Sequence, residues 1–156
     1  MAKAHFLAGF SYYQLKQPRA AEKHLEQAIT KVKKIPDDWR RVLLAVYLDG
    51  KQYRKAETIL HSLIECEPDN RSWWNYLAVA YLEQEKEDKA LAALVLAYHR
   101  SRLDTDDLMR IVRLYSSNGI PEKAARLLRK WLKAGRLEAT RKTYKLQFEL
   151  WHLACE

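Results

Sequence analysis

Four basic side chains in the last third of the chain could bind an anionic partner. They lie at i, i+3, i+4 and i+7, which would place them on one face of a helix, and they are Arg126, Arg129, Lys130 and Lys133. Such a stripe can bind the phosphates of a nucleic acid, with an affinity that falls steeply as salt rises. It can also attract an acidic protein surface, or be the solvated face of a helix. Because no aromatic residue alternates with the basic ones, we favour an acidic protein over nucleic acid.

Candidate catalytic residues form no recognisable group. The histidines are scattered, and neither a nucleophile beside a base nor a glycine-rich phosphate loop is present. His61 precedes Cys66 by five residues, a poor helical spacing for contact. The acidic pairs at 37–38 and 106–107 precede helical patterns, where carboxylates favour the helix dipole. No Cys/His cluster has metal-ligand spacing, so we predict that the chain is not an enzyme and has no cofactor or metal.

The elements that must position these side chains recur at a nearly constant repeat interval of about 34 residues. One alanine marks each copy, and it follows a tyrosine at a fixed offset and precedes a leucine by four positions. The alanines are Ala21, Ala56, Ala90 and Ala124; the tyrosines are Tyr12, Tyr47, Tyr81 and Tyr115; the leucines are Leu25, Leu60, Leu94 and Leu128. This period is typical of a solenoid, because a single unit cannot bury its apolar face alone.

Each repeat unit contains two helical patterns. In the third unit, Trp74, Leu77 and Tyr81 share one helical face, a polar break follows at 85–87, and Ala90 and Leu94 begin a second face. A short alanine side chain lets the second helix lie close to the tyrosine of the first. The sequence therefore predicts four pairs of packed helices.

Composition limits the class of protein. The chain has 156 residues, the size of one domain, and its 48% hydrophobic and 31% charged residues are typical of an ordered protein. No apolar run approaches the roughly 18 residues that span a bilayer, so we predict no membrane insertion. The helical pattern begins at about Lys3 without the apolar segment of a signal peptide. Such an abrupt start suits a fragment of a longer protein, in which case the compartment stays unknown.

The pattern over roughly residues 3–136 resembles the tetratricopeptide repeat family. The resemblance depends on the tyrosine and alanine series, on the small residue at Gly9 or Ala78, and on Pro68. Leu44 and Val112 depart from it, because they replace the small residue of the first helix. The family implies an all-α solenoid, a right-handed superhelix of antiparallel helix pairs with about nine helices.

We expect one domain over residues 1–156. Its repeats would span about 3–36, 37–70, 71–104 and 105–139, and a terminal helix would span 140–154, with Thr140 as its N-cap. In this last helix Tyr144, Phe148 and Trp151 form one apolar stripe, and Leu146, Leu150 and Leu153 form another. One stripe would pack on a further repeat or on a second subunit; alternatively, both would pack against the fourth repeat.

Residues 107–140 resemble, more narrowly, the repeat proteins encoded with bacterial TonB energy-transduction systems. The residues that carry this resemblance are Tyr115, Gly119-Ile120-Pro121, Lys123-Ala124-Ala125-Arg126 and Gly135-Arg136. It implies a periplasmic scaffold in a bacterial envelope assembly. Without it, a cytoplasmic location is expected.

The family resemblance also implies a binding groove lined by the first helix of each repeat. Counting one position past each inward-packing residue gives the predicted groove residues, which are Phe6, Phe10, Tyr13, Arg41, Leu48, Asn75, Val79, Leu82, Met109 and Arg113. This apolar floor with a few polar groups suits a partner segment with spaced apolar anchors. Phe6 and Phe10 could instead be covered by preceding repeats. They stand where one subfamily begins its lysine and asparagine clamp for chaperone C-termini, which argues against that activity.

Trp39 and Trp73 lie one repeat interval apart, at equivalent positions of two repeats. Exposed tryptophans are favoured interface anchors, but we favour burial between stacked helices. The sequence as a whole predicts a non-catalytic scaffold that binds an unidentified protein or peptide. The alternatives are nucleic-acid binding through the basic face, or self-assembly through the terminal helix.

Overall fold

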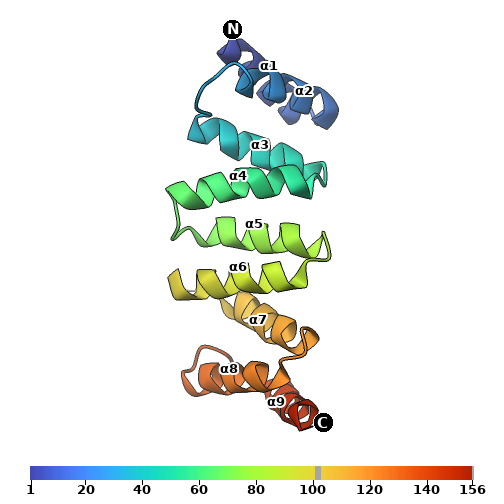
Figure 1. Ribbon diagram of the computed structural model, residues 1–156, viewed down its shortest axis with the longest axis vertical. Coiled ribbons are helices and arrows are strands. Elements are labelled where there is room, and N and C mark those ends of the chain that lie inside the picture. The colour runs from blue at the N-terminus through green and yellow to red at the C-terminus, as the bar shows by residue number, and fades with distance from the viewer. Residues whose placement is uncertain (101–102, 156) are drawn as a thin grey trace. The chain divides into compact units, whose positions relative to one another are not determined.

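The computed structural model describes residues 1–100 and 103–155, and this part of the chain contains nine α-helices and no strand (Figure 1). The chain divides into two compact units, Met1–Gln84 and Glu85–Glu156. The first unit contains α1 (Ala2–Gln14), α2 (Pro18–Ile29), α3 (Asp37–Asp49), α4 (Tyr53–Cys66) and α5 (Arg71–Leu82). The second contains α6 (Glu87–Arg100), α7 (Thr105–Ser117), α8 (Pro121–Lys133) and α9 (Arg141–Ala154).

Consecutive helices pack against one another within each unit. In the first unit α1 packs on α2 and α3 on α4, and α2–α3, α4–α5 and α1–α3 contacts join them. In the second unit α6 packs on α7, α7 on α8, and α8 on α9. Three of the four predicted helix pairs, α1–α2, α3–α4 and α7–α8, are therefore packed as an all-α solenoid requires. The division between the units falls between α5 and α6, so a single domain of four repeats stays a prediction.

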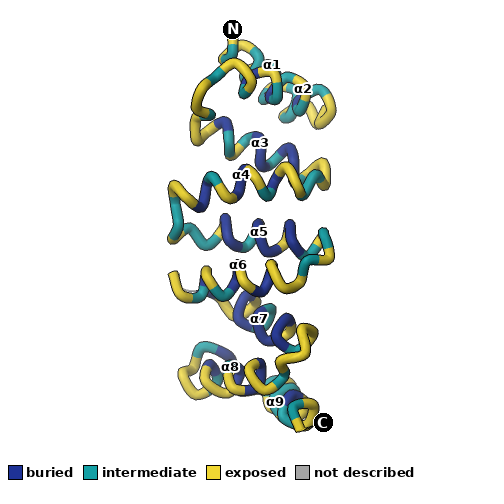
Figure 2. Tube along the Cα trace, viewed as in Figure 1, coloured by how far each residue is buried: buried dark blue, intermediate teal, exposed yellow. Residues whose placement is uncertain are grey.

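The repeated small and apolar residues form the core, as predicted. The four alanines and four leucines of the repeat are fully buried, and Tyr47, Tyr81 and Tyr115 are nearly so. Figure 2 shows the buried positions recurring along the helices. Tyr12, in the first helix, is only half-buried and stacks on His24, with ring centroids 5.2 Å apart.

The small residue of the first helix pair fits closely against the second helix of that pair. Gly9 of α1 is buried, and a Cβ atom there would lie 2.7 Å from Cγ of Leu25 and 3.0 Å from the carbonyl oxygen of Ala21. The larger residues at the equivalent positions, Leu44 and Val112, are also buried. Their departure from the family pattern therefore changes local packing and preserves the fold.

Side chains and prolines set several helix starts. Pro18 and Pro121 occupy the first turns of α2 and α8, where no intrahelical hydrogen bond is lost. Thr140 caps α9 as predicted, and it shares a reciprocal capping box with Thr143. Asp104 caps α7, whereas the acidic pairs at 37–38 and 106–107 lie within the first turns of α3 and α7 and do not precede them. No helix in the described residues is long and apolar enough to cross a bilayer.

Candidate protein-interaction surfaces

The predicted groove residues lie on the first helix of each pair. Most of them belong to the first unit, on α1, α3 and α5, whereas Met109 and Arg113 lie on α7 of the second unit. Arg41, Val79 and Arg113 are exposed, and the other seven are half-buried. The groove residues of α1, α3 and α5 therefore remain accessible within one compact unit.

Phe6 joins α1 to α3. Its ring stacks on Trp39 with centroids 4.6 Å apart and planes only 4° from parallel, and it also stacks on Phe10 with centroids 6.4 Å apart. The contact with Trp39 occupies one face of Phe6 and limits what a partner could reach. Trp39 and Trp73 are each 8% exposed, which confirms that these tryptophans are packed.

Arg41 makes the corresponding contact between α3 and α5. Its guanidinium lies 5.4 Å from the ring centroid of Trp73 and donates a hydrogen bond to Glu67. Glu67 also accepts from Asn70 at 2.8 Å and from the Trp73 indole at 2.9 Å. The hydrogen bonds from Asn70 and Trp73 lower the pKa of Glu67. Arg41, expected as a polar group facing a partner, is thus already held by its neighbours.

Tyr13 makes a third link, near the C-terminal ends of α1 and α3. Its hydroxyl donates to Asp49 at 2.9 Å, and burial together with this hydrogen bond raises the pKa of Tyr13. A pocket of about 390 Å³ lies beside the pair. Aromatic and polar contacts at three places therefore fix α1, α3 and α5 side by side.

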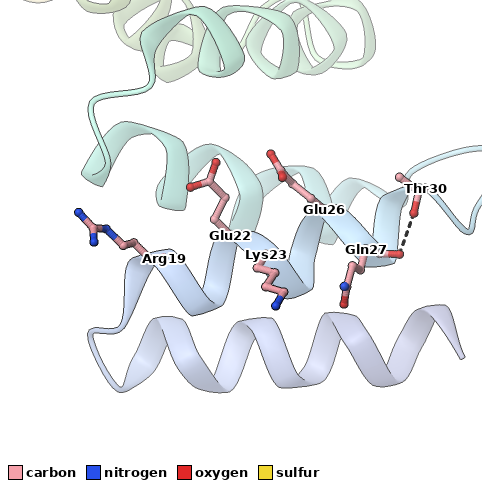
Figure 3. Close-up of a pocket in the computed structure, with 6 residues that line it drawn as sticks. All are labelled: Arg19, Glu22, Lys23, Glu26, Gln27 and Thr30. Carbon is pink, nitrogen blue, oxygen red and sulfur yellow. Dashed lines mark hydrogen bonds between the residues drawn. The ribbon is translucent and has the colours of Figure 1, made fainter.

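A second pocket of about 420 Å³ lies along α2 alone (Figure 3). Glu22 and Glu26 point to one side of the helix in this view and Lys23 and Gln27 to the other, so the side chains do not converge. Lys55 of α4 contacts both glutamates, at 2.6 and 2.7 Å. Charges of both signs that are already paired across two helices favour a structural role for this strip.

The basic stripe lies on α8 as predicted. Its four side chains are exposed, on the face opposite the buried Ala124, Leu128 and Trp131. Arg126 is paired with Glu122 one turn earlier, at 2.6 Å. The arrangement is that of a solvated helix face, which could attract acidic groups at long range.

The terminal helix exposes aromatic residues that the groove prediction omitted. Leu150 is buried, but Tyr144 is 56% exposed and Phe148 is 73% exposed. These two follow Met109 and Arg113 by one repeat interval each, so the spacing of the repeat could have identified them. A third pocket, of about 400 Å³, lies between α7 and the start of α9 and includes Met109 and Arg113.

Helix pairs with interlocking small and aromatic residues, and first helices that present an accessible face, define a helical-repeat protein. Two models of the tetratricopeptide repeat match the chain, over residues 3–34 and 43–105, which together cover more than half of it. The chain belongs to the tetratricopeptide repeat (TPR) family. Comparison with curated protein sequences finds no significant match.

Solved structures of TPR proteins share the fold at low sequence identity. MamA MSR-1 is 18% identical, with 99% of this chain and 79% of that chain covered and a TM-score of 0.66. MamA AMB-1 is also 18% identical, covers 96% and 73% of the two chains, and has a TM-score of 0.69. YrrB, described as a TPR protein with an unusual peptide-binding site, is 18% identical, covers 95% and 73%, and has a TM-score of 0.66. At these identities the likeness establishes the fold alone.

Proposed function

We propose that this chain is a non-catalytic scaffold that binds a protein segment along the accessible face of α1, α3 and α5. The observation that carries the proposal is the lateral fixing of these helices by the Phe6–Trp39 and Arg41–Trp73 contacts. A face that is rigid before binding loses little conformational entropy when a partner docks. Leu48, Val79 and Leu82 supply apolar groups on it that are not fully buried.

The comparisons support this proposal at the level of the family. TPR domains are protein-interaction modules, and YrrB is described as having a peptide-binding site. We infer an extended segment with spaced apolar side chains as the partner, since α1, α3 and α5 offer apolar groups at repeat intervals. The resemblance of residues 107–140 to TonB-associated repeat proteins suggests a bacterial envelope assembly as the setting.

The test is capture of partners from source-cell extract, with and without nuclease, by the tagged chain and three variants. Val79→Asp and Leu82→Asp place a charge on the proposed face, and we expect both to lose the captured protein while the helical content is unchanged. Leu96→Asp is the matched control, because Leu96 is 49% exposed but lies on α6. Retained capture by both groove variants would contradict the proposal, and loss of capture with nuclease would favour nucleic acid on the basic face.

The exposed side of α9 supports a second candidate function, which is self-assembly. Tyr144 and Phe148 are large apolar side chains left in solvent, and contiguous exposed apolar surface often marks an interface. Light scattering over a dilution series should show a concentration-dependent mass that Phe148→Glu abolishes and Leu96→Glu preserves. A monomer at every concentration would reject this candidate.

A further inference from the structure

In the first unit, the α1–α3 and α3–α5 junctions follow one pattern. Phe6 on α1 contacts Trp39, and Arg41 on α3 contacts Trp73. Both tryptophans stand in the first turn of the later helix, and Phe6 and Arg41 are repeat-equivalent, one repeat interval apart. In both junctions, then, the first turn of the later helix supplies a large ring that fills the space beside the earlier one.

The junction between α7 and α9 in the second unit lacks this ring. Met109 is repeat-equivalent to Phe6 and Arg41, since it follows Arg41 by two repeat intervals. The first turn of α9 carries Arg141, Lys142 and Thr143 where α3 and α5 carry a tryptophan. A pocket of about 400 Å³ lies at this place. Its volume is within the range of small-ligand sites.

The pocket has an apolar floor and a basic rim. Leu137 is buried, Met109 and Leu146 are half-buried, and all three line the pocket. Arg113 and Lys142 also line it and are exposed, against one acidic residue, Glu138. An occupant that buries a ring on the floor and places a carboxylate at the rim would match both features.

We propose that the α7–α9 pocket binds an aromatic side chain from an acidic segment of a protein partner. The ring takes the place that Trp39 and Trp73 take in the other junctions. Carboxylates next to it in the partner's sequence pair with Arg113 and Lys142. The inference rests on the proposed scaffold function, because it assumes a protein partner, but it concerns a different unit of the chain and different residues.

The test uses end-blocked, fluorescein-labelled peptides with a central phenylalanine flanked by glutamates. Matched peptides replace the phenylalanine by alanine, or the glutamates by lysines. Fluorescence anisotropy should show that the phenylalanine–glutamate peptide binds at least about tenfold more tightly than the alanine peptide, since burying one large apolar side chain changes affinity by that factor or more. It should also bind more tightly than the lysine peptide, whose charges are repelled by Arg113 and Lys142. Equal binding of the phenylalanine and alanine peptides, or no binding of either, would overturn the proposal.

Lys142→Trp is the decisive variant. It places a tryptophan of the chain itself in the pocket, in the first turn of the helix, where α3 and α5 already carry one. We expect this variant to bind the phenylalanine–glutamate peptide at least about tenfold more weakly. We also expect its thermal unfolding midpoint to rise. Lys145→Trp is the matched control, with the same charge change on the same helix outside the pocket lining. Undiminished binding to Lys142→Trp, or equal weakening by both variants, would refute the assigned pocket.

The two proposals fail separately. If Val79→Asp and Leu82→Asp abolish capture of the natural partner but Lys142→Trp leaves the peptide affinity unchanged, the scaffold function stands and the α7–α9 pocket does not. If peptide binding depends on Lys142→Trp and Arg113→Gln while the groove variants keep their partner, the pocket stands and the α1–α3–α5 face does not.

Discussion

At the scale of single residues, the turn inside each helix pair depends on one backbone conformation. Lys16, Lys51, Glu85 and Gly119 have φ values of 56°, 54°, 58° and 73°, and they follow one another by one repeat interval each. The left-handed region costs an L side chain roughly 1–2 kcal/mol. Glycine avoids this cost, but only the fourth pair has it.

Replacing one of the strained residues by glycine should stabilise the protein. We expect Lys51→Gly to raise the free energy of unfolding by about 1 kcal/mol, because the backbone keeps its shape without the steric penalty. Gly119→Ala should lower it by a similar amount. Urea unfolding of both variants measures the two changes, and a destabilised Lys51→Gly would show that its side chain contributes more than the strain removes.

The contact between Glu22 and Lys55 makes the free energy of unfolding depend on pH in the acid range. Burial disfavours ionisation of Glu22, but hydrogen bonds from Lys55 and Gln52 outweigh it and lower its pKa. The unfolded carboxyl titrates near pH 4.3, at about its free value. The pKa of Glu22 is lower in the folded than in the unfolded protein, so the ionised carboxylate stabilises the folded state. This stabilisation is fully present above the unfolded pKa and is lost as the pH falls through the folded pKa.

Lys55→Met should reduce that acid dependence. At neutral pH we expect a loss of at most about 1 kcal/mol, because the Lys55 side chain is 47% exposed and its ion pairs are screened by solvent. Between about pH 6 and pH 3 the variant should lose less stability than the unmodified chain. Lys23→Met, which removes the same charge from α2, is the control. If the free energy of unfolding of Lys55→Met fell as steeply with acid as that of the unmodified chain, this account would be wrong.

The residue types could predict only part of this detail. Asn118-Gly119 indicates a turn because glycine and asparagine tolerate left-handed angles, and the polar run at 85–87 indicates a break. Lysine and glutamate carry no such signal. At Lys16 and Lys51 the left-handed residue closes the C-terminal end of the first helix of the pair, where the next residue, Gln17 or Gln52, donates its N–H to the carbonyl of Tyr12 or Tyr47.

At the scale of helices, the fit of α1 on α2 depends on Gly9. We expect Gly9→Ala to destabilise the protein by roughly 1–3 kcal/mol, because the new methyl group would overlap Leu25. The intrinsic preference of helices for alanine acts in the opposite direction by about 1 kcal/mol, so the sign of the change decides which effect is larger.

A double-mutant cycle isolates the clash. In a Leu25→Ala background the space beside residue 9 is vacated, so the same Gly9→Ala change should cost less or become favourable. Thermal or denaturant unfolding of the four proteins gives the coupling. The same penalty in both backgrounds would show that the contact with Leu25 is not its cause.

Helices and their pairing were predictable because four copies report the same pattern. A spacing shared by the alanines, leucines and tyrosines leaves few alternative assignments, and the observed α1–α8 follow it. The contacts of Arg41 with Glu67 and Trp73 were not predictable, because they depend on a loop and on a side chain of the next repeat. The α7–α9 pocket was missed for a related reason, since the first turn of α9 departs from its counterparts.

At the scale of the whole molecule, the groove residues were extrapolated from repeat positions. That extrapolation located accessible residues on α1, α3, α5 and α7, but it could not distinguish Arg41, which is held by its neighbours, from Val79, which is not. It also stopped at Arg113, although the same interval continues to Tyr144 and Phe148 on α9. Whether these residues bind partners stays a prediction for the experiments above.

The lateral contacts of the first unit have a consequence for how such a chain can change length. Phe6 contacts Trp39, and Trp73 stands one repeat interval further on at the equivalent place. Deleting residues 37–70 in frame would bring Trp73 to the position where Phe6 now meets Trp39. The new junction would consist of the same two ring types, without compensating substitutions. Gain or loss of a whole repeat is therefore a small evolutionary step for this unit, whereas an insertion of another length inside one of these helices would turn the ring away from its partner.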